Sequence, residues 1–188
     1  MTDDPPARRS DATRAAIMDA ARRRFAADGF RKATIRAIAA DAGIDPSMVM
    51  RYYGSKEDLF AAAIDIDLGL PDLSTTAPSD VGDALTRQFL TLWERPPTNE
   101  ILLTLLRSAV TDDAVVAKFQ QVFAEQVAPA VRRVGDPADA LRRAGLVVSQ
   151  LLGLALCRYV LRLPPVTALT TDQIVTDVAP TIQRYLTA

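Results

Sequence analysis

The 188-residue chain lacks histidine, and Cys157 is its single cysteine. Without histidine the chain cannot form a Ser-His-Asp triad, a Cys-His pair or an HExxH zinc site. One cysteine cannot form a disulfide within the chain, which favours a reducing, cytoplasmic setting. The phosphate-binding patterns GxxxxGK[ST] and GxGxxG are also missing. The sequence therefore predicts no catalytic residue, no metal site and no cofactor, and nothing in it favours an enzyme.

The chain as a whole lacks an excess of charge, but one span is basic. Across the chain 22 Lys and Arg face 23 Asp and Glu, whereas between Arg8 and Lys56 eleven basic residues face five acidic ones, a net +6. Such a span on a nearly neutral protein indicates an anionic partner for that span, although a solvated charged surface has the same composition.

Uninterrupted apolar runs of membrane-spanning length are also lacking. The most apolar run, residues 144–161, contains Ser149, Gln150 and Arg158. Polar residues inside such a run argue against a membrane span and favour a helix buried at an interface. We therefore expect no membrane partner.

Ala and Leu dominate the composition, and the spacing of apolar residues predicts an all-α fold. Capping signals predict a helix from Ser10 or Asp11 to about Asp28, a second from Thr34 to Gly43, a third from Asp45 to about Tyr53, and a fourth from Ser55 to about Gly69. Five more helices are expected at about 79–94, 98–110, 112–134, 137–162 and 171–186. A turn that holds Gly43 joins the second and third helices, as in a helix-turn-helix.

The third helix has the pattern of a helix that reads DNA. Val49 and Tyr53 lie one turn apart and share the inward face, so that residues 46, 47, 50 and 51 point outward. Arg51 can donate two hydrogen bonds to guanine, and Met50 can contact a thymine methyl group. Ordinary packing or solvation would explain each of these side chains alone. Together, on one surface, they favour DNA binding.

Residues 10–60 resemble the DNA-binding domain of the tetracycline-repressor family of bacterial transcriptional regulators. The stretches that carry the resemblance are FAADGFRKATI (25–35), IRAIAADAGID (35–45) and RYYGSKEDL (51–59). The resemblance implies a homodimer on a near-palindromic double-stranded operator, and a small-molecule effector that enters the C-terminal domain and releases the DNA.

Residue roles follow from the same resemblance. The expected base readers are Arg36, Pro46, Ser47, Met50 and Arg51. The expected phosphate contacts are Thr34, Tyr52 and Lys56. Two residues depart from the family pattern, since Met48 replaces a common Thr and Met50 replaces a common Tyr. Both changes remove a polar contact to DNA.

The expected division of the chain is a flexible N-terminal arm (1–9), a helix-turn-helix DNA-binding domain (10–56) and a helical regulatory and dimerisation domain (57–188). A regulatory pocket should be mostly apolar with a few polar groups. The candidate pocket residues are Phe89, Trp93, Arg107, Phe119, Phe123 and Cys157. The candidate dimer residues, on the two helices that pair in this family, are Leu146, Leu154, Val178 and Ile182.

Three functions remain open at this point. The favoured hypothesis is a repressor that responds to a small apolar ligand. A second is a DNA-binding regulator without an effector. A third is an all-helical ligand-binding protein that does not bind DNA.

Overall fold

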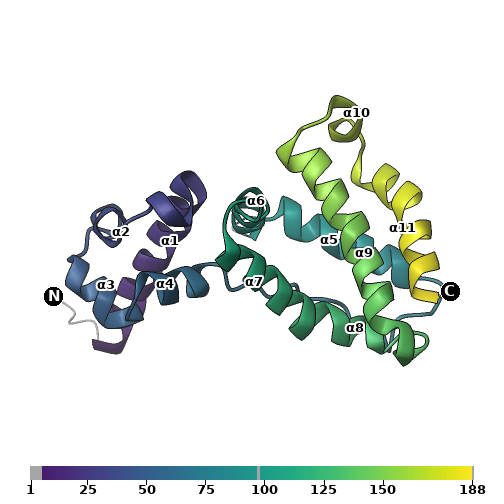
Figure 1. The fold of residues 1–188 in the computed structure, drawn as a ribbon, viewed down its shortest axis with the longest axis horizontal. Helices are drawn as coiled ribbons and strands as arrows, with labels where there is room; N and C mark the ends of the chain where they lie inside the picture. The colour runs from purple at the N-terminus through teal and green to yellow at the C-terminus, as the bar shows by residue number, and fades with distance from the viewer. Residues whose placement is uncertain (1–5, 97, 188) are drawn as a thin grey trace.

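The computed structural model describes residues 6–96 and 98–187, and within these ranges the chain forms helices and no strand. The predicted all-α fold is confirmed. Helices α1–α4 form one group and α5–α11 a second, larger group, with α6 and α7 nearest the first (Figure 1).

Four helices make up the N-terminal group. They are α1 (Pro6–Lys32), α2 (Ile35–Ala42), α3 (Pro46–Tyr53) and α4 (Lys56–Ala63). Helix α1 begins before the predicted Ser10 or Asp11, because Pro6 suits a first turn, where its missing N–H needs no partner. Residues 6–9, the last part of the predicted arm, are thus helical. Residues 1–5 of that arm lie outside the described residues. The predicted stop, Gly29, has φ 71° and ψ 170°, and helical residues continue to Lys32 after this break.

Buried apolar side chains from all four helices form the core of the N-terminal group. Ile17 and Val49 are fully buried, and Phe25 packs edge-on against Phe60 with ring centroids 4.9 Å apart. Each such side chain stabilises the fold by about 1.5–3 kcal/mol relative to an exposed one. This core fixes the orientation of α3 relative to α1.

Helix α4 ends at Ala63, so the predicted continuation to Gly69 is wrong. The chain instead runs as a non-helical strap over residues 64–80. The Gln126 side-chain amide accepts from the Leu68 N–H (2.8 Å) and donates to the Ile66 carbonyl (2.7 Å). These bonds replace those that a helix would make, and Gly69 turns the chain with φ 51°.

The C-terminal group contains the remaining elements. They are α5 (Val81–Glu94), α6 (Thr98–Ser108), α7 (Asp113–Val122), a π-helical turn (Phe123–Val127), α8 (Ala128–Arg132), a 3-10 turn (Pro137–Asp139), α9 (Ala140–Ala155), a second π-helical turn (Leu156–Val160), α10 (Pro164–Thr167) and α11 (Thr171–Thr187). The five predicted helices are present within a few residues, two of them divided by π-helical turns, while α10 was not predicted. Two prolines, Pro164 and Pro165, form the first turn of α10, where their missing N–H groups need no partner.

Helices α5 and α11 approach each other closely at Gly82. The Gly82 N–H donates to Gln183 Oε1 at 2.8 Å, and a Cβ atom on Gly82 would lie 2.5 Å from the Ala179 carbonyl oxygen. Because that oxygen belongs to a helix backbone, it cannot move aside cheaply. We expect Gly82→Ala to destabilise the fold by about 1–3 kcal/mol, which urea unfolding followed by circular dichroism would measure. Asp83→Ala, a change at the neighbouring residue, should unfold close to the parent; equal losses in both variants would refute the packing argument.

Candidate nucleic-acid interface and ligand cavity

The helix-turn-helix is fixed by local capping at each of its ends. Thr34 caps α2, with its Oγ accepting from the Ala37 N–H at 3.2 Å, and Gly43 ends α2 with φ 66°. Asp45 caps α3, since its carboxylate accepts from both the N–H (2.8 Å) and the hydroxyl (2.6 Å) of Ser47. These hydrogen bonds hold the pKa of Asp45 below its usual value. The carboxylate therefore stays ionised and keeps α3 capped.

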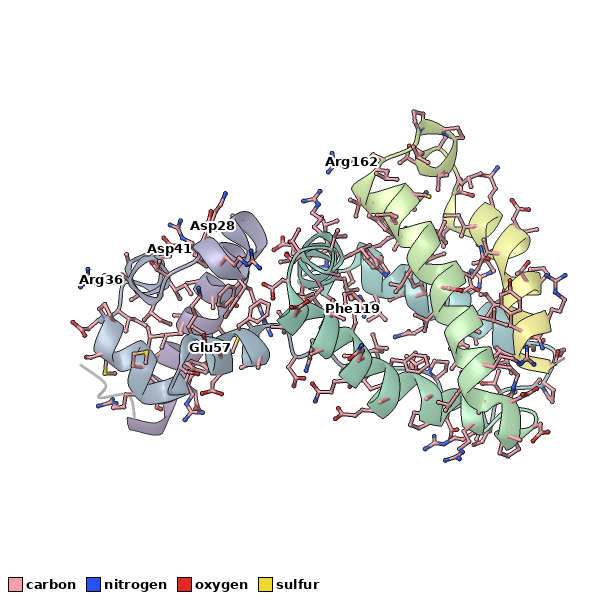
Figure 2. The ribbon with its side chains drawn as sticks, viewed as in Figure 1. Asp28, Arg36, Asp41, Glu57, Phe119 and Arg162 are labelled. Carbon is pink, nitrogen blue, oxygen red and sulfur yellow. The ribbon has the colours of Figure 1, made fainter. Side chains whose placement is uncertain are left out.

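The side chains expected to read bases lie on an exposed face. Arg36, Pro46, Ser47 and Arg51 are exposed, as is Met50 at 43%, whereas Val49 between them is fully buried. Figure 2 shows Arg36 at the edge of the molecule away from the C-terminal group. The Ser47 hydroxyl already donates to Asp45. The Ser47 oxygen can therefore accept a hydrogen bond from a donor group on a base.

The three expected phosphate contacts are placed differently from one another. Thr34 is exposed and its hydroxyl proton remains free to donate. The Tyr52 hydroxyl donates to Ser10 Oγ over 3.4 Å, a long bond that a phosphate oxygen could replace. The Lys56 ammonium lies 4.4 Å from the centre of the Phe30 ring. A cation–π contact is worth about 0.5–1 kcal/mol at an exposed site and about 2 kcal/mol when desolvated, and Lys56 is half-buried, so the ring competes with a phosphate to a modest extent.

Arg14 of α1 joins this surface and was missed in the sequence. Its guanidinium lies 5.3 Å from the centre of the Tyr52 ring, and that of Arg51 lies 5.6 Å from it. The hydrogen bond to Ser10, with the nearby Arg51 and Arg14 charges, lowers the pKa of the Tyr52 hydroxyl. No local pattern marks Arg14, because the contact joins α1 to α3 and depends on the tertiary fold.

An ion-pair group joins α1 to the last turn of α2. Arg24 donates to Asp41 at 2.5 and 2.8 Å and to Asp28 at 3.3 Å. The hydrogen bonds to Asp41 and Asp28 raise the pKa of the guanidinium, and Arg24 lowers that of Asp41. Asp28 and Asp41 come from different helices and lie near each other in Figure 2. The group sets the orientation of α2 on α1.

A cavity of about 130 Å³ lies in the C-terminal group, between α5, α6, α7, α9 and the strap. A cavity of about 150 Å³ in another protein holds benzene, so this one suits a single ring or a short alkyl chain. Four of the candidate pocket residues, Phe89, Trp93, Phe119 and Phe123, line it. Figure 2 shows Phe119 on the inner side of α7.

Several cavity residues were missed. The strap contributes Ile66, Leu68, Leu70 and Leu73, and α7 contributes Lys118. The sequence predicted a helix to about Gly69, so these strap residues were not expected beside a cavity. Their strict alternation of apolar and other residues from Ile66 to Leu70 was the signal that could have placed them beside the cavity.

Two predicted pocket residues are not on the cavity wall. Arg107 is exposed in the last turn of α6, and Cys157 is half-buried in the π-helical turn after α9; neither lines the cavity. Both predictions are therefore wrong for this cavity. Although Arg107 lies in an apolar run of the sequence, α6 places it on the outer face.

Trp93 also borders a second cavity of about 250 Å³, with Arg158, Tyr159 and Arg162 on its wall. The Trp93 and Tyr159 rings stack at 5.1 Å with an angle of 8° between their planes. Burial raises the pKa of Tyr159 to about 12, so its hydroxyl stays protonated at neutral pH. Figure 2 shows Arg162 beside the end of the helix that leads into α10.

In the part of the chain that the structure describes, no cluster of His, Cys, Asp or Glu could hold a metal ion.

The predicted dimer residues divide into two kinds. Leu146, Leu154 and Val178 are only half-buried, which leaves part of each available to another chain. Ile182 is fully buried inside the protomer, so its prediction as a contact residue is wrong. Its neighbours in the core, not a partner, account for its apolar side chain.

Helix α9 and its flanking turns are long and apolar enough, by length and composition, to cross a membrane. Only 28% of the most apolar stretch is buried within the chain, and the exposed Gly145 and Gly153 have open space where a Cβ would stand. This face can therefore accept a closely packed helix.

Two family models match the chain. Residues 17–63 match the model described as bacterial regulatory proteins, tetR family, and residues 79–186, more than half of the chain, match the tetracyclin repressor-like C-terminal domain. The first match contains α2, α3 and α4, and the second contains α5 to nearly the end of α11.

Relatives share sequence or fold with the chain. The HTH-type transcriptional repressor SCO4008 of Streptomyces coelicolor is 38% identical over 77 residues, which are 41% of this chain and only 39% of that protein. The crystal structure of the TetR-family regulator SCO0857 from Streptomyces coelicolor A3 has 30% identity and a TM-score of 0.67, covering 94% of this chain and 95% of that one. The SmeT–triclosan complex has the same fold at 20% identity, with a TM-score of 0.69 and 90% of each chain covered.

Proposed function

Because this chain belongs to the tetracycline-repressor family of DNA-binding transcriptional regulators, we propose that it is a homodimeric repressor. A small, mainly apolar ligand releases it from a near-palindromic operator. The family is not enzymatic, which confirms that the chain is not an enzyme.

The observation that carries the proposal is the exposed face of α3. The helix is capped by Asp45, anchored by the buried Val49, and presents Ser47, Met50 and Arg51 to solvent. A recognition helix in the major groove needs this combination of a fixed axis and free outward side chains. Arg36 adds a further base contact, and Thr34, Tyr52 and Lys56 contact phosphates.

The proposed effector site is the apolar cavity of the C-terminal group. Four aromatic side chains and the apolar strap form most of its wall. SmeT, which has the same fold, has been solved as a complex with triclosan. We assign residues 10–56 to DNA binding and 57–188 to regulation and dimerisation, with the boundary in the first turn of α4.

The proposed dimer forms through α9 and α11, where Leu146, Leu154 and Val178 meet their counterparts. The half-exposed apolar surface of α9 supports this interface. Two copies present two α3 helices, which is why the operator should be a near-palindrome. The proposed DNA contact supports a cytoplasmic location.

Selection of genomic DNA by the purified protein at physiological salt, followed by sequencing, tests the proposal. We expect enrichment of a near-palindrome whose half-sites are about 10–10.5 base pairs, or a multiple of this, apart. Light scattering on the same sample should give the mass of a dimer. A folded dimer that enriches no sequence would contradict a sequence-specific repressor.

A further inference from the structure

Lys118 is the one charged side chain among the described residues that line the apolar cavity. It lies on α7, and its side chain is 11% exposed. Its ammonium is 3.0 Å from Asp65 Oδ1, with a longer contact of 3.4 Å to Gln121 Oε1. Asp65 is therefore the charged partner of a mostly buried lysine side chain beside the cavity.

Asp65 marks the mouth of the cavity. It lies between the end of α4 and Ile66, which lines the cavity, and its own side chain is 77% exposed. The Lys118 stem therefore lies along the apolar wall while its ammonium reaches the border with solvent. A ligand whose apolar part fills the cavity would bring one end to this ammonium.

We propose that the effector is an amphiphilic anion, with an apolar chain or ring in the cavity and a carboxylate that replaces Asp65 as the partner of Lys118. This inference rests on the proposed function, since it specifies the ligand of the same cavity. The exchange is nearly balanced in charge, because Lys118 keeps a carboxylate partner and the released Asp65, already exposed, regains water. Burial of the apolar part then drives binding.

The same exchange connects the cavity to the DNA-binding group. In the free protein the Lys118–Asp65 pair ties α7 to the residue that closely follows α4, and α4 begins with Lys56. A carboxylate ligand breaks that tie, whereas a neutral ligand of the same shape leaves it intact. Only the anion should therefore release DNA.

Octanoate and 1-octanol, which share a chain and differ in the head group, test the inference. Trp93 lines the cavity and is the one tryptophan in the chain, so its fluorescence reports binding of either probe. We expect Lys118→Met to weaken octanoate binding about tenfold or more, and Asp65→Asn to tighten it about threefold or more by removing the competing carboxylate. Octanol binding should change little in both variants, and octanoate alone should release the DNA enriched by genomic selection.

Opposite shifts in the two variants support the inference, because a purely structural pair would not produce them. Equal octanoate affinity in the parent and both variants overturns it and leaves a neutral effector for the same cavity. Absence of any fluorescence change with octanoate at millimolar concentration overturns it too. If the parent retains no DNA, the proposed function fails, but the titrations still decide the ligand class. Thermal unfolding checks that the variants fold, and Lys118→Gln replaces Lys118→Met if that one does not.

Discussion

Replacing Arg143 by Met should cost the fold about 3–5 kcal/mol, a large part of the stability of an ordinary domain. Arg143 is the largest fully buried side chain, at 1% exposure, and lies near the start of α9. Its guanidinium donates to three backbone carbonyls, those of Val134 (2.6 Å), Leu186 (2.6 Å) and Asp136 (2.5 Å).

Two of these carbonyls lie at the C-terminal ends of helices. Val134 follows α8, and Leu186 lies in the last turn of α11, where helix carbonyls lack intrahelical donors. A cation at a helix C-terminus is also favoured by the helix dipole. Arg143 thus joins the ends of two helices to the start of a third.

Loss of the guanidinium leaves the carbonyls in place. Apolar replacement of a buried ion pair can be harmless when both partners are removed, but here the acceptors are backbone groups that stay buried. Each unsatisfied buried group costs about 1–3 kcal/mol. Arg143→Lys should recover only part of the loss, because a single ammonium cannot reach three separated oxygens as a planar guanidinium does.

Urea unfolding at one fixed protein concentration measures this effect, since the stability of a dimer depends on concentration. Arg142→Met is the matched control, because the neighbouring Arg142 is exposed and, among the described residues, its ion pair is with the exposed Asp139. The control should keep the urea midpoint of the parent. If Arg143→Met also kept it, water would have to satisfy the three carbonyls.

Features set by local chemistry could be predicted from the sequence. Thr34, Asp45 and Ser55 cap the helices that follow them, and Gly43 and Gly54 end α2 and α3 with positive φ, all as expected. Each of these depends on residues within one helical turn. The outward face of α3 followed in turn from the buried Val49.

Features set by distant residues could not be predicted. Helix α4 ends early because Gln126, far along the chain, bonds the strap. Arg143 looked like a surface arginine beside Arg142, and its burial depends on carbonyls from α8 and α11. Lys118 lacked any local sign of its role, since its partner Asp65 lies in the strap after α4, far away in the sequence.

Removing Arg51 should weaken binding to the enriched operator by about 5- to 150-fold per half-site, corresponding to about 1–3 kcal/mol for a base-reading arginine. A dimer carries two copies of Arg51, so the loss for the whole operator is the square of that factor if the half-sites are independent. The Arg51 side chain is exposed and lies against the Tyr52 ring at the surface, so Arg51→Ala should leave the fold intact.

The dependence of binding on DNA sequence separates base reading from sequence-independent electrostatic attraction to the phosphates. Arg51→Ala should lose discrimination at one base pair in each half-site, as measured with operators substituted one position at a time. Lys56→Ala should weaken binding to every sequence and reduce the slope of log K against log salt by about one unit per half-site. Arg132→Ala, which removes the same charge from an exposed position on α8, is the control for net charge.

The comparison among these three variants decides the role of α3. If Arg51→Ala weakens all operators equally and lowers the salt slope as Lys56→Ala does, Arg51 contacts phosphate, and Ser47 and Met50 must carry the specificity of α3. That outcome is physically reasonable, because the Arg51 guanidinium lies beside Tyr52, itself a phosphate candidate. Loss of discrimination at one position, with an unchanged salt slope, requires instead that Arg51 leaves the Tyr52 ring and enters the major groove, where its two parallel donors match the edge of guanine.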